Sequence, residues 1–458
     1  MIVSISPSFI PISHVLTESR PGDSMICAWK GGILVWSDFT RLISRLTGAL
    51  SSQPAESAIV ACADPLNFLA TLLALWHCGR TPVIPSNYRP ETLKQLTAHG
   101  GHGISDADVV DLAERFSPAR LGRLDPAASR LILYTSGSTG EPKMIDKTLS
   151  QLDAELTLQE SQWGDAVSGC GVLATVPHYH IYGLLFRLLW PLAAGRPFDC
   201  CTCANPEQLG ERIACFTDHI LVSSPSHLTR FPRLMELGDW NPAPRLLFSS
   251  GGPLPAETAA IYRRHFGNSP VEIFGSTETG GVAWRQRQGN PEDDLWTPLP
   301  GVRVHRDTDS ALLLDSPFLS HRNWRMDDAI SLLSDGRFRL EGRLDRIVKL
   351  EGKRLALPEM ERRLEAHPWV ASAAVVPLLN VSRLGAVVVP TPAGRSALDT
   401  YGQRGTKQAL RDHLKDAFEP VLLPRRFRFV TELPFSDRGK VTHQELKSLF
   451  ESPDESDA

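Results

Sequence analysis

Short apolar segments alternate with longer segments of helical length over the first part of the chain. Ala58–Cys62 and Thr81–Pro85 have the length and apolar character of buried strands, and the helix-like segment Pro65–His77 lies between them. Two strands joined by a helix in this order form a βαβ unit, in which the strands are parallel. The pattern therefore predicts parallel sheets covered by helices.

Three further apolar segments are followed by glycine, hydroxyl residues or proline. They are Leu131–Leu133, Cys170–Thr175 and Arg245–Ser249. In open α/β sheets, ligands collect at the carboxyl ends of the strands. We therefore expect the polar segments that follow these strands to converge on one site.

The pattern changes near Gly342–Arg343, where we place a domain boundary. Before it, Ser334–Leu340 predicts a hairpin turn with a flanking strand. After it, the chain predicts a helix over Pro358–His367, strands over Ala371–Val376 and Gly385–Val389, and a helix over Gly405–Ala417. We predict an α/β fold: a large N-terminal domain of parallel or mixed sheets covered by helices (residues 1–342) and a small, mobile α+β C-terminal domain (residues 343–458).

Composition and charge agree with a multidomain protein and exclude some functions. The chain has 458 residues, 42% of them hydrophobic, which is too long for one ordinary core. Its net charge is -4 without a basic stripe, so we expect no nucleic-acid surface. The N-terminus lacks the basic region of a signal peptide, and the apolar segment Leu69–Trp76 is too short to span a bilayer. We expect a cytoplasmic protein without a membrane span.

The cysteines do not predict a metal site. Eight are irregularly spaced, and Cys200, Cys201 and Cys203 form the only cluster. A metal would need a fourth ligand and better spacing. We predict instead that this cluster lies on a half-buried strand after Gly195–Pro197, and reduced thiols fit the cytoplasm.

The segment Tyr134–Lys143 has the sequence Tyr-Thr-Ser-Gly-Ser-Thr-Gly-Glu-Pro-Lys. Gly137 and Gly140 allow the backbone to bend so that several N–H groups point into one concavity. The hydroxyl groups add donors and Lys143 adds a mobile positive charge, so the segment suits a polyphosphate. It lacks the Gly-Lys-Ser/Thr order of a Walker-type loop. Taken alone, it is also compatible with an ordinary surface loop.

This segment resembles the phosphate-loop signature of the adenylate-forming superfamily, which includes acyl- and aryl-CoA ligases, peptide-synthetase adenylation domains and luciferases. Further signatures follow in the family's order. They are the aromatic-Gly-x-Thr-Glu motif (Phe274–Gly280), the Gly-Arg-x-Asp hinge block (Gly342–Asp345 with Lys349, Gly352, Arg354 and Glu359–Glu361) and the C-terminal Pro…Gly-Lys motif (Leu433–Lys440). The large domain is shorter than is usual in the family, so the chain resembles its short forms.

The resemblance implies an ATP site. The phosphate loop would cradle the β- and γ-phosphates, Lys143 would follow the departing pyrophosphate, and Thr277 would donate to the α-phosphate. Met144 replaces a glycine that usually follows this lysine. Phe274 would lie against adenine, with Ser250–Pro253 as the opposite wall. The implied ATP-binding set is Thr135, Ser136, Gly137, Ser138, Thr139, Gly140, Lys143, Ser250, Gly251, Gly252, Pro253, Phe274, Gly275, Thr277, Asp328, Arg343 and Arg354.

Within this set the resemblance assigns further roles. Glu278 would bind Mg²⁺, which prefers hard oxygen ligands. Asp328 and Arg343 would bind the ribose, with Asp327 as the fallback because Met326 and Asp327 replace the usual Thr-Gly. Asp345 would be the hinge of the small domain.

Lys440, which precedes an apparent helix over Thr442–Phe450, would bridge the carboxylate and the α-phosphate during adenylate formation. The implied catalytic residues are Lys440, His180, Glu278, Thr277 and Lys143.

The segment Val176–Leu184 resembles the part of the family that borders the carboxylic acid. His180 occupies the place of a gating His or aromatic residue, although a packed core histidine is the alternative. No acidic residue lies between Pro177 and Pro191, so the ammonium group of an amino acid would be buried without a counter-charge. The implied acyl pocket comprises His180, Tyr182, Gly183, Gly251, Ser276 and Gly280.

The expected reaction is activation of a small carboxylic acid by ATP to acyl-AMP, with release of pyrophosphate and transfer to a phosphopantetheine thiol. The thiol would belong to CoA or to an acyl carrier protein, as in the short ligases of bacterial aryl-polyene pathways that this chain resembles. His180–Gly183 is similar to coumarate- and benzoate-type ligases, and a tyrosine hydroxyl in an apolar pocket suits a phenolic group. We therefore expect an aromatic acid, including 4-hydroxylated ones, and place medium-chain fatty acids second.

Two other functions share these motifs. A non-catalytic nucleotide-binding regulator would be expected to lose Lys440 or Glu278, which only catalysis needs, and both are present. A luciferase-like oxygenase shares the adenylation step, and tests for light output or oxygen uptake would separate it from a ligase.

Overall fold

The chain folds into two compact units. The computed structural model describes residues 8–29, 32–52, 55–98, 102–136, 142–350, 353–378, 383–434 and 443–450. Unit 1 consists of Met1–Arg303 and Asp315–Arg322, and unit 2 consists of Val304–Leu314 and Asn323–Ala458. This division lies upstream of the boundary at Gly342–Arg343, which stays a prediction, as does the hinge at Asp345.

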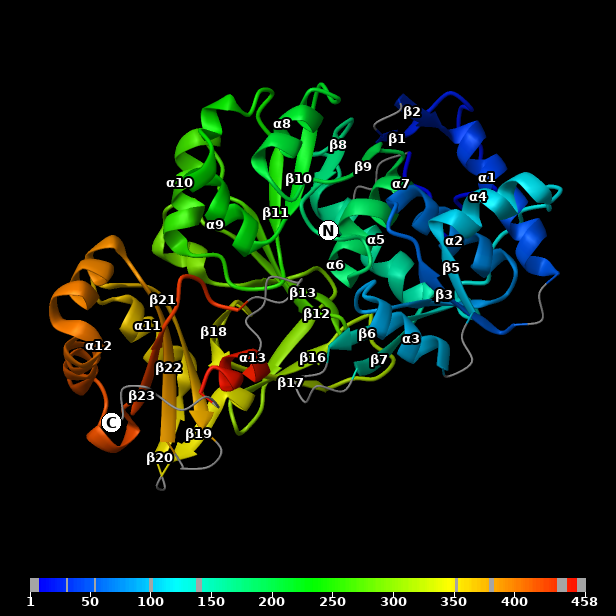
Figure 1. The fold of residues 1–458 in the computed structure, drawn as a ribbon. Coiled ribbons are helices and arrows are strands. Elements are labelled where there is room, and N and C mark those ends of the chain that lie inside the picture. The colour runs from blue at the N-terminus through cyan, green and yellow to red at the C-terminus, as the bar shows by residue number, and fades with distance from the viewer. Residues whose placement is uncertain are drawn as a thin grey trace. The chain divides into compact units, whose positions relative to one another are not determined.

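The larger sheet of unit 1 has a parallel centre, as the βαβ pattern predicts (Figure 1). Its strand order is β14 (Thr297–Pro298), β13 (Gly280–Gln286), β12 (Val271–Ser276), β11 (Leu246–Ser249), β10 (His219–Ser223), β8 (Gly171–Ala174), β9 (Phe198–Thr202), β1 (Met25–Trp29) and β2 (Gly32–Val35). Strands β8 and β10 are buried along their whole length, which explains their continuous apolar sequence.

Helices cover this sheet on both faces. On one face lie α8 (Pro206–Ile213), α9 (Pro225–Leu234) and α10 (Ala256–Phe266), together with the 3₁₀ turn η2 (Leu237–Asp239). Their side chains Leu209, Leu228 and Tyr262 form one apolar cluster with Leu221 and Leu247 of the strands. A second 3₁₀ turn, η3 (Pro291–Asp294), precedes β14.

Aromatic rings fill the opposite face. This face carries α5 (Leu149–Trp163), α6 (Ile181–Gly183), the π-helix η1 (Leu184–Leu189) and α7 (Trp190–Ala194). The rings of Trp163, Phe186 and Trp190 surround Phe248, with centroid distances of 5.4, 5.2 and 5.9 Å. The side chains of Phe248 and its neighbour Leu247 thus point to opposite faces of the sheet, as the alternation of side chains along a strand requires.

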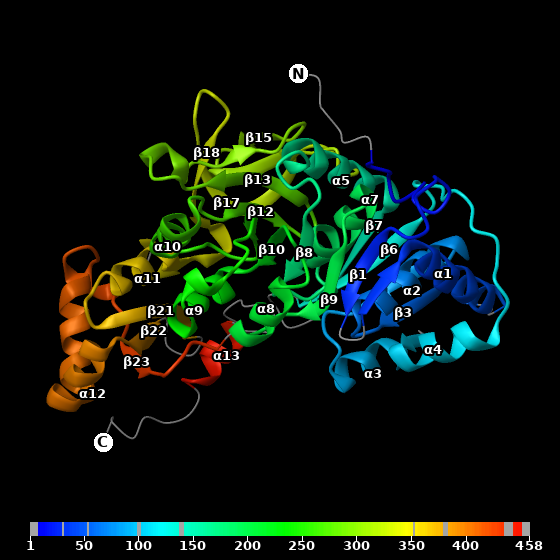
Figure 2. The same ribbon diagram turned by 90° about the horizontal axis from the view of Figure 1, so that it is seen from above.

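The smaller sheet of unit 1 contains the strand that leads into the phosphate loop (Figure 2). Its order is β5 (His102–Ser105), β3 (Ser57–Ala61), β4 (Thr81–Ile84), β6 (Arg130–Ser136) and β7 (Pro142–Thr148), with α1 (Trp36–Ser51), α2 (Pro65–His77), α3 (Pro90–Ala98) and α4 (Asp106–Arg115). Strands β5, β3, β4 and β6 are parallel, and β7 returns antiparallel to β6. Helix α2 matches its predicted bounds, because the Asp64 side chain caps Leu66 and Asn67 and Pro65 opens the first turn.

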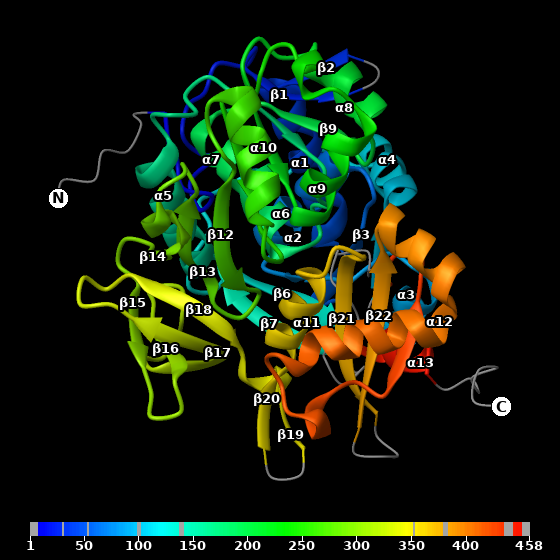
Figure 3. The same cartoon turned by 90° about the vertical axis from the view of Figure 1, so that its left-hand side faces the viewer.

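Within the described residues, unit 2 contains helices and mainly antiparallel sheets, with one parallel strand pair at Gly385–Val388 and Arg426–Phe429 (Figure 3). One sheet has the order β15 (Arg303–Arg306), β16 (Ala311–Asp315), β17 (Trp324–Leu332) and β18 (Phe338–Arg343). The 3₁₀ turn η4 (Leu344–Arg346) leads to the hairpin β19 (Ile347–Leu350) and β20 (Lys353–Ala356). The last sheet comprises β21 (Val370–Leu378), β22 (Arg383–Pro390) and β23 (Arg426–Phe429), with α11 (Leu357–Glu365), α12 (Pro392–Lys415), the 3₁₀ turn η5 (Pro420–Leu422) and α13 (His443–Ser448).

The last sheet of unit 2 is covered on both faces. Helices α11 and α12 share an apolar cluster with Val375 of β21, whereas α13 shares a different cluster with the adjacent Val376. The α+β character predicted for the C-terminal part is therefore confirmed. The predicted helix Gly405–Ala417 is the second half of α12, whose backbone departs from helical geometry at Gly402 (φ 63°).

The cysteine cluster lies at a strand, as predicted. Cys200 and Cys201 are half-buried on β9, and Cys203 is buried just after it. All eight cysteines are free thiols. Within the described residues, no helix has the length and apolar character required to cross a membrane.

Candidate active site

The phosphate-loop lysine and the glutamate of the aromatic-Gly-x-Thr-Glu motif meet in unit 1. Lys143 lies at the start of β7, opposite Thr135 of β6. Glu278 lies in the turn between β12 and β13, and Nζ of Lys143 donates to its Oε1 at 2.8 Å. The Thr135 hydroxyl donates to the Lys143 carbonyl at 3.4 Å. Two motifs separated by more than a hundred residues thus place a cation and a carboxylate together.

Glu278 has the charge that a magnesium ligand needs. Burial raises its pKa, but the hydrogen bond and the positive charge of Lys143 outweigh this effect and leave the pKa below its usual value. The group is therefore a carboxylate at neutral pH. No group of three or more His, Cys, Asp or Glu side chains suited to a metal occurs in the described part of the chain. Mg²⁺ is often bound by one protein carboxylate together with phosphates and water, so the carboxylate of Glu278 suits this ion.

The turn that carries Glu278 is closed by its own hydroxyl groups. The backbone N–H of Ser276 donates to Oγ1 of Thr279 at 3.1 Å, and the N–H of Thr279 donates to Oγ of Ser276 at 3.2 Å. A Cβ on Gly275 would lie 2.3 Å from the Gly280 carbonyl oxygen, so only glycine fits there. The motif glycine therefore allows β12 and β13 to approach closely where the turn begins.

The predicted adenine wall follows β11. The Ser250 hydroxyl donates to the carbonyl of Ile273 in β12 at 2.9 Å, and this bond ties the two adjacent strand ends together. Phe274 lies next along β12 and packs its ring on Trp296, with a centroid distance of 5.5 Å. Gly251, Gly252 and Pro253 are exposed beside this strand end. The segments after β11 and β12 thus share one edge of the sheet, as expected.

The predicted acyl segment follows β8 and brings several aromatic rings together. His180 is the residue before α6 and is half-buried, and its ring contacts Tyr179 at a centroid distance of 4.6 Å. Tyr179 in turn contacts Tyr88, again at 4.6 Å. Tyr182 packs against Phe186, and burial raises its pKa well above the usual value, so its hydroxyl stays neutral.

His178 is a buried residue of this segment that the sequence did not single out. Its Nε2 lies 3.1 Å from the Cys62 carbonyl and 3.4 Å from the Tyr88 hydroxyl. Because a carbonyl oxygen only accepts, Nε2 carries the proton. Burial and, to a smaller extent, the positive charge of Arg187 lower the pKa of His178 to about 3. The hydrogen bond to the Cys62 carbonyl raises this pKa, but its effect is weaker. His178 is thus a neutral packing residue at the base of the segment.

Arg187 of η1 anchors the same segment from inside the protein. Its guanidinium group is fully buried and donates to the carbonyls of Val176, Asp199 and Cys200 at 3.1–3.2 Å, and to the Thr202 hydroxyl at 2.7 Å. These bonds fix the backbone just before Pro177. Arg187 therefore joins the start of the acyl segment to β9.

In unit 2 the two predicted ribose ligands face each other across a strand pair. Asp328 of β17 and Arg343 of β18 are register partners, and their charged atoms lie 3.8 Å apart. Asp328 is buried, whereas the fallback Asp327 is exposed and pairs with Arg325 at 3.4 Å. Asp328 is thus the better placed of the two for a role with Arg343.

Several predicted residues lie outside the described residues or are described by their backbone alone. Ser136 ends β6, Asp345 lies in η4 and Arg354 lies in β20. The roles assigned to all of these residues stay predictions. Those outside the described residues are Gly137, Ser138, Thr139, Gly140, Gly352 and Lys440.

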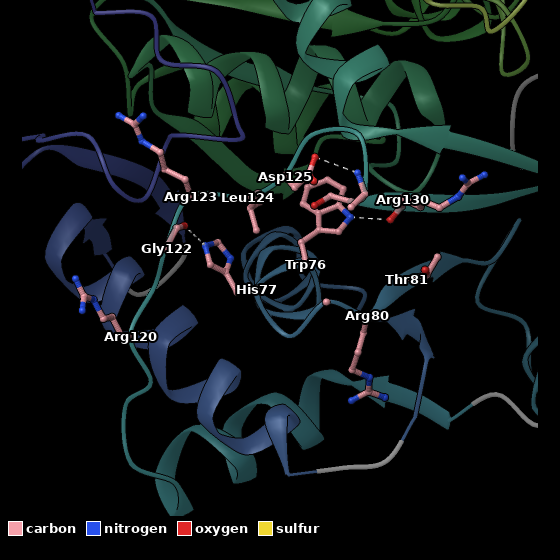
Figure 4. A pocket seen from close by; sticks show the side chains of 13 residues that line it. Trp76, His77, Arg80, Thr81, Arg120, Gly122, Arg123, Leu124, Asp125 and Arg130 are labelled. Carbon is pink, nitrogen blue, oxygen red and sulfur yellow. Dashed lines mark hydrogen bonds between the residues drawn. The ribbon is translucent and has the colours of Figure 1, made fainter.

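A cavity of about 320 Å³ lies at the opposite end of the smaller sheet, where β4 and β6 begin (Figure 4). It is bordered by Trp76, whose indole N–H donates to the Arg130 carbonyl at 2.7 Å. Four arginines border it, but Figure 4 shows their side chains pointing in different directions, away from one another. These charges do not converge on an anion, so the cavity adds no ligand site.

Comparison with known proteins identifies the family. The model for AMP-binding enzymes matches residues 89–310, and the model for their C-terminal domain matches residues 359–440. A 4-coumarate–CoA ligase from Cereibacter sphaeroides is 30% identical over 323 residues, covering 68% of this chain and 70% of that protein. An anthranilate–CoA ligase from Pseudomonas aeruginosa is 29% identical over 403 residues, covering 79% and 75%.

A solved structure shares the fold of nearly the whole chain. The ATP-bound structure of MatB from Rhodopseudomonas palustris has a TM-score of 0.78 and 18% identity, covering 96% of this chain and 99% of that one. At this level of identity the likeness concerns the fold alone. It agrees with the predicted large α/β domain followed by a smaller C-terminal domain.

Proposed function

Because the chain belongs to the family of AMP-binding enzymes, we propose that it is an AMP-forming acid–thiol ligase. In this proposal it activates a carboxylic acid with ATP, releases pyrophosphate, and transfers the acyl group from acyl-AMP to a phosphopantetheine thiol. The observation that carries the proposal is the 2.8 Å contact between Lys143 and Glu278. A polyphosphate with a divalent ion needs this combination of a mobile cation and a metal carboxylate.

The proposed roles follow from the charges that develop during the reaction. The displacement at the α-phosphate builds negative charge on the phosphates, which Lys143 and Thr277 would stabilise. Glu278 would hold Mg²⁺, which when bound neutralises phosphate charge. Asp328 and Arg343 would bind the ribose, and Lys440 would orient the carboxylate. These residues bind and position, and no proton transfer by a side chain is required.

We further propose that the acid is aromatic, with 4-hydroxylated acids included. Two features support this proposal: the packed rings of Tyr88, Tyr179 and His180, and the neutral hydroxyl of Tyr182, two residues after His180 in the chain. Aromatic faces favour a planar substrate, and a neutral phenol can donate to or accept from a phenolic group. The coumarate and anthranilate ligases among the relatives act on aromatic acids and support the same class. Medium-chain fatty acids remain the second candidate.

The test is ATP–pyrophosphate exchange with Mg²⁺ and without thiol, across benzoate-type, cinnamate-type and straight-chain acids. We expect exchange with the aromatic acids and much less with the straight-chain acids. Equal exchange with both classes would contradict the aromatic assignment. No exchange with any acid, despite ATP binding, would favour either an acid outside this panel or the non-catalytic regulator. Thioester formation with CoA and with a phosphopantetheinylated carrier protein would then identify the acceptor.

Tyr182→Phe tests the phenolic contact within the same assay. We expect kcat/KM to fall about ten-fold for a 4-hydroxylated acid, because the lost hydrogen bond leaves a buried polar group unpaired. The value for the acid without the hydroxyl group should change little, which makes it the internal control. An equal fall for both acids would mean that Tyr182 only packs.

A further inference from the structure

A buried lysine supports the backbone of Glu278. Lys147 lies on the same face of β7 as Lys143, because side chains four apart along a strand point the same way. Lys143 is exposed at the strand's start, whereas Lys147 is only 3% exposed. Its Nζ donates to the backbone carbonyl of Glu278 at 2.6 Å. The two lysines of β7 thus hold the same glutamate, one by its side chain and the other by its backbone.

A buried glutamate supports the other end of the same turn. Glu155 lies on the buried face of α5 and accepts from the backbone N–H of Gly281 through Oε1 at 2.7 Å. A Cβ on Gly280 would lie 2.4 Å from its Oε2, so the turn is packed directly on this carboxyl group. The negative charge of Glu155 also acts on Lys147 and works against the lowering of the lysine pKa by burial.

These contacts form a clamp on the turn that carries Glu278. Lys147 holds the carbonyl at residue 278 and Glu155 holds the N–H at residue 281, while both come from the β7–α5 segment that follows the phosphate loop. We propose that Lys147 and Glu155 are positioning residues that fix Glu278 for Mg·ATP. This inference rests on the proposed function, because it takes Glu278 as the metal carboxylate. It goes beyond that function, since neither residue belongs to the motifs that identify the site.

Buried charges at this place are costly unless they perform a specific task. A lysine and a glutamate removed from water lose their hydration, and hydrophobic residues of similar size would pack there at less cost. Each has one strong backbone partner on the Glu278 turn. Groups that orient a metal ligand typically change metal affinity or activity by about 10- to 100-fold when they are removed.

Hydrogen–deuterium exchange tests the clamp without any substrate. Glu155→Leu removes the acceptor for the Gly281 N–H, so exchange of the 277–284 segment should rise in the free protein. Glu155→Gln keeps an acceptor oxygen and should retain most of the protection. Glu114→Gln is the control, because Glu114 is exposed on α4 of the smaller sheet and its replacement leaves no buried charge. This control should leave exchange of the segment as in the wild type.

ATP binding at a series of Mg²⁺ concentrations tests the metal role. Lys147→Met should raise the half-saturating Mg²⁺ concentration about ten-fold or more. Lys147→Arg keeps the cationic donor, so its half-saturating Mg²⁺ concentration should lie between those of the wild type and Lys147→Met. A merely structural role would lower the amount of binding protein and leave that concentration unchanged. Because the measurement needs no acid, it stays informative if pyrophosphate exchange fails with every acid.

Two results would overturn the proposal. One is a wild-type exchange rate in the 277–284 segment for both Glu155→Leu and Lys147→Met. The other is a raised exchange rate with an unchanged Mg²⁺ requirement, since the turn would then be supported without serving the metal carboxylate. Equal effects of Lys147→Arg and Lys147→Met would likewise contradict a role for the cationic donor.

Discussion

Replacement of Glu155 by glutamine should remove a pH dependence from the stability of unit 1. Burial raises the pKa of Glu155 to about 7 from 4.5, while the bond from Gly281 and the charge of Lys147 act in the opposite direction. Between these two values the folded chain keeps a proton that the unfolded chain has released. Its stability therefore falls as the pH rises through this window. A difference of about 2.5 pH units corresponds to about 3–4 kcal/mol, at about 1.4 kcal/mol per unit.

Urea unfolding of the wild type and of Glu155→Gln from about pH 5 to about pH 8 measures this difference. Of the ten tryptophans, Trp324 and Trp369 belong to unit 2, so the other eight make fluorescence a probe mainly of unit 1. The glutamine keeps an acceptor for Gly281 but cannot ionise. We expect the variant to gain about 2–3 kcal/mol relative to the wild type as the pH rises across the range.

A control variant separates this effect from the general influence of pH. Glu114 of α4 is exposed, so Glu114→Gln should give a curve of the same shape as the wild type. Parallel curves for the wild type and Glu155→Gln would refute the reasoning. They would mean that the folded protein ionises Glu155 as readily as the unfolded chain does, and that burial is compensated by groups other than Gly281 and Lys147.

Two further variants test the site. Gly275→Ala places a Cβ 2.3 Å from the Gly280 carbonyl oxygen. We therefore expect a loss of about 1–3 kcal/mol of stability in urea unfolding and at least ten-fold slower pyrophosphate exchange. The control Gly103→Ala has no heavy atom within 4 Å of the new Cβ and should change pyrophosphate exchange little. Lys440→Ala should abolish acyl-AMP formation in the exchange assay yet spare thioester formation from a supplied acyl-AMP, and an equal loss of both half-reactions would contradict the role proposed for Lys440.

The fold could be predicted from the sequence where local signals agree with packing. Helix α2 has its predicted bounds, since Asp64 and Pro65 mark its start and its apolar residues are buried throughout. The strands before the polar segments, β6, β8 and β11, follow from short apolar runs. The approach of Lys143 to Glu278 joins strands of two different sheets, so strand order did not predict it, and only the family resemblance placed both residues in one ATP site.

Other parts of the fold and of the site depend on contacts between distant segments of the chain, which local sequence patterns do not indicate. Strand β23 has two arginines in four residues and pairs with β22 only because the chain returns to that edge. The first half of α12 contains Gly394 and Gly402, which weaken a helical pattern, and only its second half was predicted. Glu155 had a signal that was not used: an acidic residue lies in the apolar stripe formed by Leu149, Leu152 and Leu156.

Two ion pairs of unit 1 have the same length but differ in the solvent exposure of their side chains, and this difference decides how much each contributes to stability. Glu160 and Arg196 are 2.8 Å apart with side chains 0% and 6% exposed, so removal of one partner leaves a buried charge at a cost of about 3–5 kcal/mol. Lys143 and Glu278 are also 2.8 Å apart, but their side chains are 57% and 23% exposed. A pair of this kind contributes at most about 1 kcal/mol. In the proposed site, Lys143 would therefore leave the glutamate for a phosphate, and Glu278 would leave the lysine for Mg²⁺, with little loss of stability. Lys147 and Glu155 would meanwhile keep the backbone of the turn in place.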